Sequence, residues 1–165
     1  MNQYNINGQI NSNNQNIIEV ELKDCFDYDQ KENIMSGDNA MYCNNCKQMN
    51  SSSMYLKLYT GPDILILLLN REKEIEFNVK IKFDEILNLE DYVESKETDK
   101  KYNLIGIITH IGENSMNGSY IAYCKDPING KWHKYNDAFV SEVYNFEKEV
   151  IDYAMPYLLF YQKIK

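Results

Sequence analysis

The stretch LIGIITHIGENSMNGSYIAYC, residues 104–124, decides the fold. Two runs rich in isoleucine and tyrosine, Leu104–Thr109 and Tyr120–Cys124, favour β-strands because branched and aromatic side chains suit a half-buried sheet. Between them, Gly112–Gly118 is rich in glycine, asparagine and serine, which is the composition of a hairpin loop. The stretch therefore predicts two antiparallel strands joined by that loop.

Further strands are predicted on both sides of this hairpin. Lys131–Asn136 and Tyr157–Gln162 have strand composition, and Asp126–Gly130 has the composition of a second hairpin loop. Upstream, Ile64–Leu69 is apolar at every position. An uninterrupted apolar run of this length predicts a central strand that is buried on both faces.

Alternation and composition complete the expected fold. Residues 75–83 place apolar side chains at every second position, which predicts a strand that covers one face of the core. A short helix is expected near residues 24–28, while residues 1–16 are rich in asparagine and are expected to be a disordered leader. No linker divides the remainder. The prediction is one domain of the α+β class, predominantly antiparallel β.

The composition limits the function classes open to the chain. Its 165 residues carry a net charge of -8, which would repel a phosphate backbone, so nucleic acid is not an expected partner. No apolar run approaches the roughly 20 residues that span a bilayer, and the polar start of the sequence lacks a signal-peptide core. Four cysteines without the pattern of a disulfide framework are typical of an intracellular protein, and no membrane partner is expected.

Four motifs follow one another along the second half of the sequence. They are His110-x-Gly112, Gly118-Ser119-Tyr120, Trp132-x-x-Tyr135-Asn136-Asp137 and Leu158-Leu159-Phe160-Tyr161. In this order they resemble the C-terminal part of the ubiquitin-specific proteases, which reads His-x-Gly, Gly-His-Tyr, Trp-x-x-aromatic-(Asn or Asp)-Asp and Leu-Phe-Tyr. The resemblance extends upstream through Tyr42-Cys43-x-x-Cys46 and Pro62-Asp63-Ile64, and so covers nearly all of the chain after residue 16.

This resemblance implies a domain of fingers, palm and thumb, with the C-terminal tail of ubiquitin in the cleft. Residues 17–60 would form the fingers and residues 61–165 the palm, while the thumb with its catalytic Cys box is missing from this sequence. Ubiquitin or ubiquitinated proteins are the implied partners. A thumb-like partner segment would complete the domain.

The implied chemistry is hydrolysis of an isopeptide bond by a cysteine, a histidine that takes the thiol proton, and an Asn or Asp that orients the imidazole. None of the four cysteines lies in the Gly-Asn-x-Cys-Tyr box of the family. Ser119 stands at the position of the histidine, and a hydroxyl with a pKa far above 7 cannot serve as the base. Asn136, with Asp137 beside it, matches the third position. The resemblance thus predicts a site that is inactive by itself.

Two histidines are present, and neither is an evident replacement for the missing base. His133 has the opposite parity to Asn136 along the predicted strand, so their side chains would point to opposite faces. The resemblance places His110 near the ubiquitin tail, together with Gly118 and Tyr120. The alternatives are partly exposed sheet residues for both histidines and a packed hairpin turn for Gly118 and Tyr120.

Cys43 and Cys46 have the spacing of one half of a zinc site. In the family this position pairs with an earlier C-x-x-C, which the sequence lacks, although tetrahedral zinc needs four ligands. Zinc binding and a vestigial, metal-free knuckle are the two alternatives.

Three functions remain open at this point. The chain could be a degenerate deubiquitinase without activity by itself. It could instead be a ubiquitin-binding or scaffolding pseudoenzyme. The third alternative is a fragment of a longer active enzyme.

Overall fold

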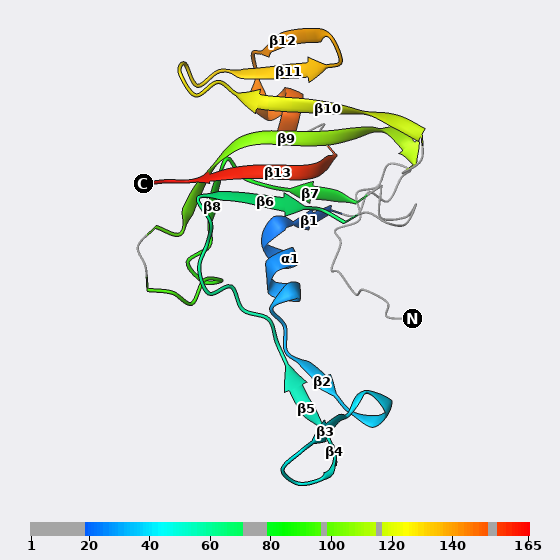
Figure 1. The fold of residues 1–165 in the computed structure, drawn as a ribbon. Helices are drawn as coiled ribbons and strands as arrows, with labels where there is room; N and C mark the ends of the chain where they lie inside the picture. Colours follow the sequence, from blue (N-terminus) through cyan, green and yellow to red (C-terminus); the bar gives the residue numbers. More distant parts are fainter. Residues whose placement is uncertain (1–18, 71–78, 97–98, 115–116, 152–154) are drawn as a thin grey trace.

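The computed structural model describes residues 19–70, 79–96, 99–114, 117–151 and 155–165. Figure 1 shows a broad sheet from which a slender extension projects. The broad sheet, called the main sheet below, has seven strands. Six are hydrogen-bonded in the order β12-β11-β10-β9-β13-β6, and β8 also pairs with β9. The strands are β6 Ile64–Leu68, β8 Ile86–Asn88, β9 Lys101–Asn114, β10 Asn117–Lys125, β11 Trp132–Asn136, β12 Phe139–Val143 and β13 Pro156–Lys163.

The strands predicted in the second half of the sequence are confirmed. β9 and β10 contain the two runs of the opening hairpin, and all pairs of the main sheet are antiparallel. The loop predicted at Gly112–Gly118 is wrong in extent, because β9 continues to Asn114 and β10 starts at Asn117. Backbone pairing of Asn117 with Asn114 and of Ser119 with Ile111 carries the ladder into the predicted loop, with an irregularity between Asn117 and Ser119.

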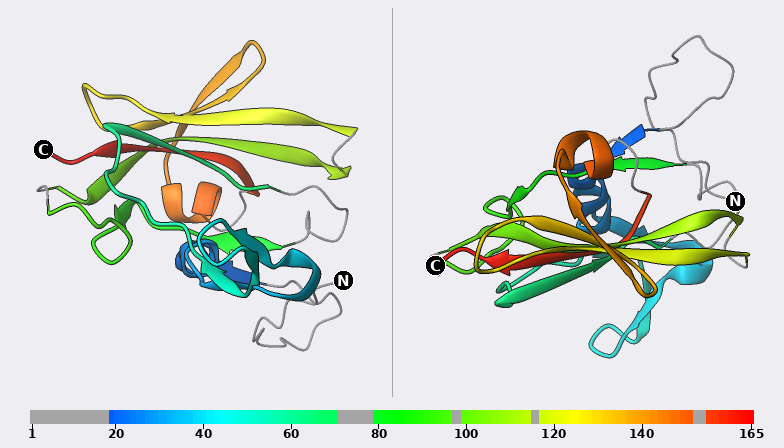
Figure 2. Two further views of the ribbon diagram at one scale, coloured as in Figure 1. Left: turned by 60° about the horizontal axis from the view of Figure 1, so that its bottom comes forward. Right: turned by 90° about the horizontal axis from the view of Figure 1, so that it is seen from above.

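One face of the main sheet carries the core and is called the covered face. Its central side chains are buried: Tyr102, Leu104, Ile107, Ile121, Tyr123, Trp132, Val143, Leu159 and Tyr161. Figure 2 shows helix α1 (Leu22–Asp29) and the π-helical segment η3 (Glu147–Ile151) on the same side of the sheet. Two buried tyrosines also tie loops to the sheet, since Tyr102 donates to the carbonyl of Pro62 at 3.0 Å and Tyr161 to that of Asp84 at 2.8 Å.

The opposite side, the open face, carries a series of apolar side chains that are not buried. They are Ile64, Ile66, Leu68, Ile108, Tyr120, Ala122, Tyr135, Val140, Leu158 and Phe160, which share one side by register. All of these side chains are exposed or half-buried in the part of the chain that the structure describes.

β6 shows the open face most clearly. Ile64, Ile66 and Leu68 are 43%, 55% and 59% exposed, and β6 is the last strand of the described sheet. The prediction of a central strand buried on both faces is therefore wrong. The uninterrupted apolar run arose because both faces of this edge strand are apolar, and the described chain partly buries one of them through Leu65 and Leu67.

The extension contains two small antiparallel pairs. β2 (Asn33–Met35) pairs with β5 (Ser52–Met54), and β3 (Met41–Cys43) pairs with β4 (Gln48–Asn50). The short 3-10 helix η1 (Gly37–Asn39) lies between β2 and β3. None of the side chains on these four strands is buried, and several large apolar residues of this extension are exposed.

A separate short pair flanks the helix. β1 (Glu19–Glu21) runs parallel to β7 (Lys80–Lys82), and the Lys82 ammonium lies 2.9 Å from a Glu19 carboxylate oxygen. α1 confirms the predicted helix, and the hydroxyl of Tyr92 donates to Asp27 on it at 2.8 Å. The strand predicted over residues 75–83 lies partly outside the described residues. Within them, Ile81 and Phe83 are buried, as the alternation predicted.

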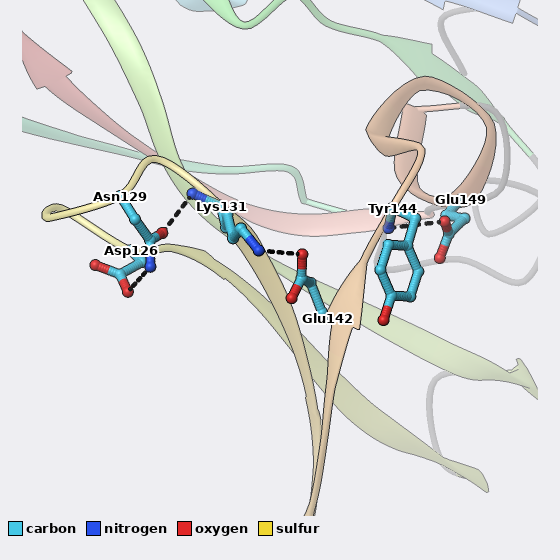
Figure 3. Close-up of polar contacts among 6 residues, drawn as sticks. All are labelled: Asp126, Asn129, Lys131, Glu142, Tyr144 and Glu149. Carbon is cyan, nitrogen blue, oxygen red and sulfur yellow. Dashed lines mark hydrogen bonds and ion pairs between the residues drawn. The ribbon is translucent and has the colours of Figure 1, made fainter.

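Polar contacts hold the connections around β11 and β12 in place (Figure 3). Lys131 Nζ lies 2.8 Å from Glu142 Oε1, and the Glu149 carboxylate accepts from the backbone N–H groups of Tyr144 and Asn145. The ring of Trp132 stacks on Phe146 with centroids 4.3 Å apart. β11, which carries Asn136, is thereby fixed against the core. None of the helices in the described part of the chain is long and apolar enough to cross a membrane.

Candidate functional site

Ser119 and Asn136 lie on neighbouring strands and share one side of the sheet. Ala122 on β10 is paired with Tyr135 on β11. Because side chains alternate along each strand, this register puts Ser119 and Asn136 on the covered face. Both residues are exposed, whereas Ile121, the next residue on this face after Ser119, is buried. The two positions therefore lie at the rim of the core, accessible from solvent.

Asp137 begins the tight turn that follows Asn136. Asn136 pairs with Phe139, so only Asp137 and Ala138 connect β11 to β12. The backbone of Asp137 has a φ of 51°, in the left-handed region that aspartate tolerates better than most residues. Asp137 is exposed, and its backbone conformation sets where β11 ends. The turn thus fixes the position of Asn136 at the end of its strand.

The residues predicted to contact the ubiquitin tail lie on the other side of the sheet. His110 pairs with Tyr120, and their rings meet edge to face with centroids 5.0 Å apart. Tyr120 also packs against Tyr157 at 5.8 Å. His110 is only 9% exposed, whereas Tyr120 is 54% exposed. The result is a row of three rings at the end of the open face.

Gly118 is required by its contact with His110. A Cβ atom at position 118 would lie 2.5 Å from Cε1 and Nε2 of His110 and 2.5 Å from the carbonyl oxygen of Ile111. Both the imidazole and a backbone oxygen would have to move to admit any side chain. Gly118 therefore links the two halves of the site, because it packs on His110 and immediately precedes Ser119.

Neither histidine of the sequence joins Ser119 and Asn136. His110 faces the open side with Tyr120, and His133 is paired with Cys124 and Glu142 on that same side. The predicted opposition of His133 and Asn136 is confirmed. Cys124 also points away from Ser119, and burial raises the pKa of its thiol, which lowers the thiolate fraction at neutral pH. The described arrangement thus lacks a nucleophile and a base beside Ser119.

Cys43 and Cys46 lie at the tip of the extension. The Lys47 N–H donates to the carbonyl of Cys43 at 2.8 Å, and Lys47 has a φ of 57°. Hydrogen bonds from the backbone and side chain of Cys46 lower the pKa of Cys43, and the Asn50 amide donates to Cys46 Sγ at 3.3 Å. A tight turn therefore presents both sulfurs.

A complete zinc site does not fit the described residues. They contain no group of three or more His, Cys, Asp or Glu side chains placed to hold a metal ion. Cys25 lies on α1 and Cys124 on β10 of the main sheet, so neither extends the Cys43–Cys46 pair. Two thiolates supply half of a tetrahedral site.

Tyr157 was not singled out from the sequence, although it contacts the ring of Tyr120. Its position just before the Leu158–Tyr161 motif was the available signal. The contact itself joins β13 to β10 across β9, and no local pattern encodes such a neighbour.

Comparison with known proteins identifies the family to which this chain is similar. A model of the family described as ubiquitin carboxyl-terminal hydrolase matches residues 8–161. The chain is 33% identical over 130 residues to ubiquitin carboxyl-terminal hydrolase 48 of Rattus norvegicus, which covers 74% of this chain and 12% of that protein. It is 31% identical over 150 residues to ubiquitin carboxyl-terminal hydrolase 2 of Gallus gallus, covering 87% and 41% respectively.

Solved structures give the same result. The chain resembles one in a SAGA DUB module of Ubp8, Sgf11, Sus1 and Sgf73 bound to monoubiquitin, with a TM-score of 0.73 and 30% identity, covering 90% of this chain and 35% of that one. A second such module, bound to ubiquitin aldehyde, gives a TM-score of 0.71 at 29% identity. The chain thus spans less than half the length of each of these relatives. The motifs, the strand-rich α+β fold and the family match agree that the chain belongs to the ubiquitin carboxyl-terminal hydrolase family, with the fold of its ubiquitin-specific proteases.

Proposed function

We propose that this chain is a deubiquitinase-type domain that binds ubiquitin and does not hydrolyse ubiquitin conjugates by itself. The observation that carries the proposal is that Ser119 and Asn136 share one face of neighbouring strands, while both histidines and Cys124 face the other side. Asn136 would orient an imidazole at position 119, and a serine hydroxyl cannot take a thiol proton near neutral pH. Because the site has neither the base nor the nucleophile of a cysteine protease, the role that remains for the chain is to bind ubiquitin.

The open face supplies the recognition surface. The exposed ring of Tyr120 is held between His110 and Tyr157, beside Gly118, which has no side chain to obstruct an extended peptide. Related modules were solved with monoubiquitin and with ubiquitin aldehyde. We place the C-terminal tail of ubiquitin against this row of rings. The net charge of -8 favours the two arginines of that tail.

Titration of isotope-labelled ubiquitin with the chain tests this binding. Signals of the ubiquitin tail should shift, and Tyr120→Ala should abolish most of the shift because it removes the central ring. Tyr144→Ala is the matched control, since Tyr144 is 86% exposed and lies outside the ring row. Unchanged tail signals at high concentrations of the wild-type chain would exclude the binding role. Release of fluorophore from a ubiquitin-fluorophore conjugate by the chain alone would contradict the proposed inactivity.

The open face also favours a second candidate, a chain completed by a further segment. An apolar sheet surface of this extent is unusual on a soluble monomer and marks an interaction site. We propose that a thumb-like segment with a Gly-Asn-x-Cys-Tyr box, from the same protein or another, covers part of this face and reaches around to the rim where Ser119 and Asn136 are exposed. The four free thiols of the chain agree with the reducing interior of the cell, where we place the protein.

Restoring the base distinguishes the two candidates. When such a segment is co-expressed with the Ser119→His variant, activity toward a ubiquitin-fluorophore conjugate should rise by about 10²- to 10⁴-fold over the serine form, the usual contribution of a positioned base. Asn136→Ala in the same background should reduce the gain, because the new imidazole loses its orienting partner. If the Ser119→His variant with the segment hydrolyses the conjugate no faster than the serine form, the second candidate is excluded. The ubiquitin-binding role is then the candidate that remains.

A further inference from the structure

The turn between β10 and β11 contains a chemically reactive pair, Asn129-Gly130. In such a pair the Gly130 nitrogen can attack Cγ of Asn129, because glycine has no side chain to hinder the approach. A bond forms between this nitrogen and Cγ, and the bond from Cγ to Nδ2 breaks. Nδ2 takes up the Gly130 proton and leaves as ammonia. Water then opens the cyclic imide to aspartate or isoaspartate, so water is the one other reactant.

Each of the reacting groups is held by a hydrogen bond in the folded chain. Asn129 Nδ2 donates to Asp126 Oδ2 at 2.8 Å, as Figure 3 shows. Asn129 Oδ1 accepts from the Lys131 N–H at 2.8 Å, and the Gly130 N–H donates to the Asp126 carbonyl at 2.8 Å. The attacking nitrogen, the carbonyl group and the leaving amide are therefore all fixed by contacts other than those of the reaction.

Asp126 is the common partner in this turn. Its second carboxylate oxygen accepts from the Ile128 N–H at 2.8 Å, and its own N–H donates to the Lys131 carbonyl at 2.8 Å. The turn is nevertheless open to water, since Ile128 is 94% exposed. The hydrogen-bonded conformation of the turn therefore protects Asn129 from attack by the Gly130 nitrogen. Burial away from water does not contribute to this protection.

We propose that Asn129 is a latent deamidation site that Asp126 keeps closed while the turn is folded. Loosening of the turn frees the Gly130 nitrogen and the Asn129 amide together. The product is a carboxylate beside the Asp126 carboxylate, in place of the present donor, so the turn cannot re-form the same contacts. An isoaspartate would also lengthen the backbone of the connection that joins the strands of Ser119 and Asn136. Modification at Asn129 would therefore weaken the β10–β11 register that puts Ser119 and Asn136 on the same face.

Peptide mass spectrometry of the incubated chain measures the reaction directly. At neutral pH and 37 °C, Asp126→Ala should raise deamidation at Asn129 by at least about tenfold, the factor that matches the loss of one hydrogen bond to a charged group. Glu142→Gln is the matched control, since it breaks the ion pair between β12 and the neighbouring Lys131 and leaves the contacts of Asn129 in place. Asn117-Gly118 serves as an internal reference in the same samples.

A second comparison uses denaturing urea. Wild-type chain in denaturing urea should deamidate at Asn129 much faster than folded chain, and Asp126→Ala should react at the wild-type rate in urea. Equal rates for folded and denatured wild type would overturn the proposal. So would an unchanged rate in folded Asp126→Ala, or an equal rise at Asn117 and Asn129, which would indicate general unfolding rather than release of one turn.

Discussion

The covered and open faces of the main sheet are made by alternate residues of the same strands, and they differ in what surrounds them. On β13, Leu159 and Tyr161 are fully buried, while their neighbours Leu158 and Phe160 are half-buried. Both sets are apolar, so hydrophobicity alone does not separate them. The difference teaches that the described chain draws its stability from one face and leaves the apolar side chains of the other at least partly exposed.

Truncation of core side chains should give the largest difference between the faces. Leu104→Ala on the covered face should lower the free energy of unfolding by about 2–5 kcal/mol, because it leaves a cavity among fully buried neighbours. Ile66→Ala on the open face should lower it by less than about 1 kcal/mol, since Ile66 is 55% exposed. Urea unfolding followed by circular dichroism measures both. Equal losses would mean that the open face is buried in solution, for example by self-association.

Removal of a buried hydroxyl should have a smaller effect. Tyr161→Phe should cost about 1–3 kcal/mol, because the Asp84 carbonyl loses its donor at 2.8 Å inside the core. Tyr120→Phe on the open face is the matched control, and its change should stay within about 0.5 kcal/mol. Comparable losses in the two variants, measured by urea unfolding, would contradict the difference between the faces.

Alkaline pH should also weaken the buried side. Burial and the hydrogen bond to Asp27 raise the pKa of Tyr92 to about 12, and burial also raises the pKa of Tyr161. Above about pH 10 the unfolded chain loses these protons while the folded chain keeps them. The unfolded state then binds fewer protons, so the free energy of unfolding falls as pH rises from about 10 towards 12.

Urea midpoints at pH 8 and pH 11 test this effect. Tyr92→Phe should be less stable than wild type at pH 8 and should lose less between the two pH values. Tyr144→Phe, at an exposed tyrosine, should behave like wild type. An identical alkaline loss in wild type and Tyr92→Phe would show that Tyr92 does not contribute.

Charges on the open face should have the smallest effect on stability and a visible effect on association. Ile66→Lys and Leu68→Lys should change the free energy of unfolding by no more than about 0.5 kcal/mol, because both side chains already contact solvent. Lysine on an edge strand also discourages pairing with another chain. Sedimentation velocity should therefore show less self-association than in wild type. If the two variants self-associate as much as wild type, the surface that mediates self-association lies outside β6.

The sequence predicts most of the main sheet because its signals are local. Alternation and turn composition locate β9, β10, β11 and β13, and the motif order identifies the positions of Ser119 and Asn136. The error at β6 has a physical cause. A strand that is apolar on both faces has the same sequence pattern whether both faces are buried or one of them is exposed.

Contacts between distant segments are what the sequence does not reveal. Gly118 reads as a turn residue, and its close approach to His110 depends on the pairing of β9 with β10. Tyr157 meets Tyr120 across an intervening strand. The hydrogen bond from the Asn129 amide to the Asp126 carboxylate depends on the rotamer of Asp126, which the composition does not specify. Each of these three contacts can be predicted only when the pairing of the strands is known.

β9 has a consequence for how the chain folds. Its 14 residues pair with β10, with β13 and with β8, so three strands share one template. Its partner β13 comes some 40 residues later in the sequence and in turn pairs with β6, about 90 residues before it. Closing such loops before any contact forms is slow, so folding should begin at the local β9–β10 hairpin and proceed outward on a millisecond-to-second timescale. The amides of β9 should then be among the last to exchange with solvent deuterium.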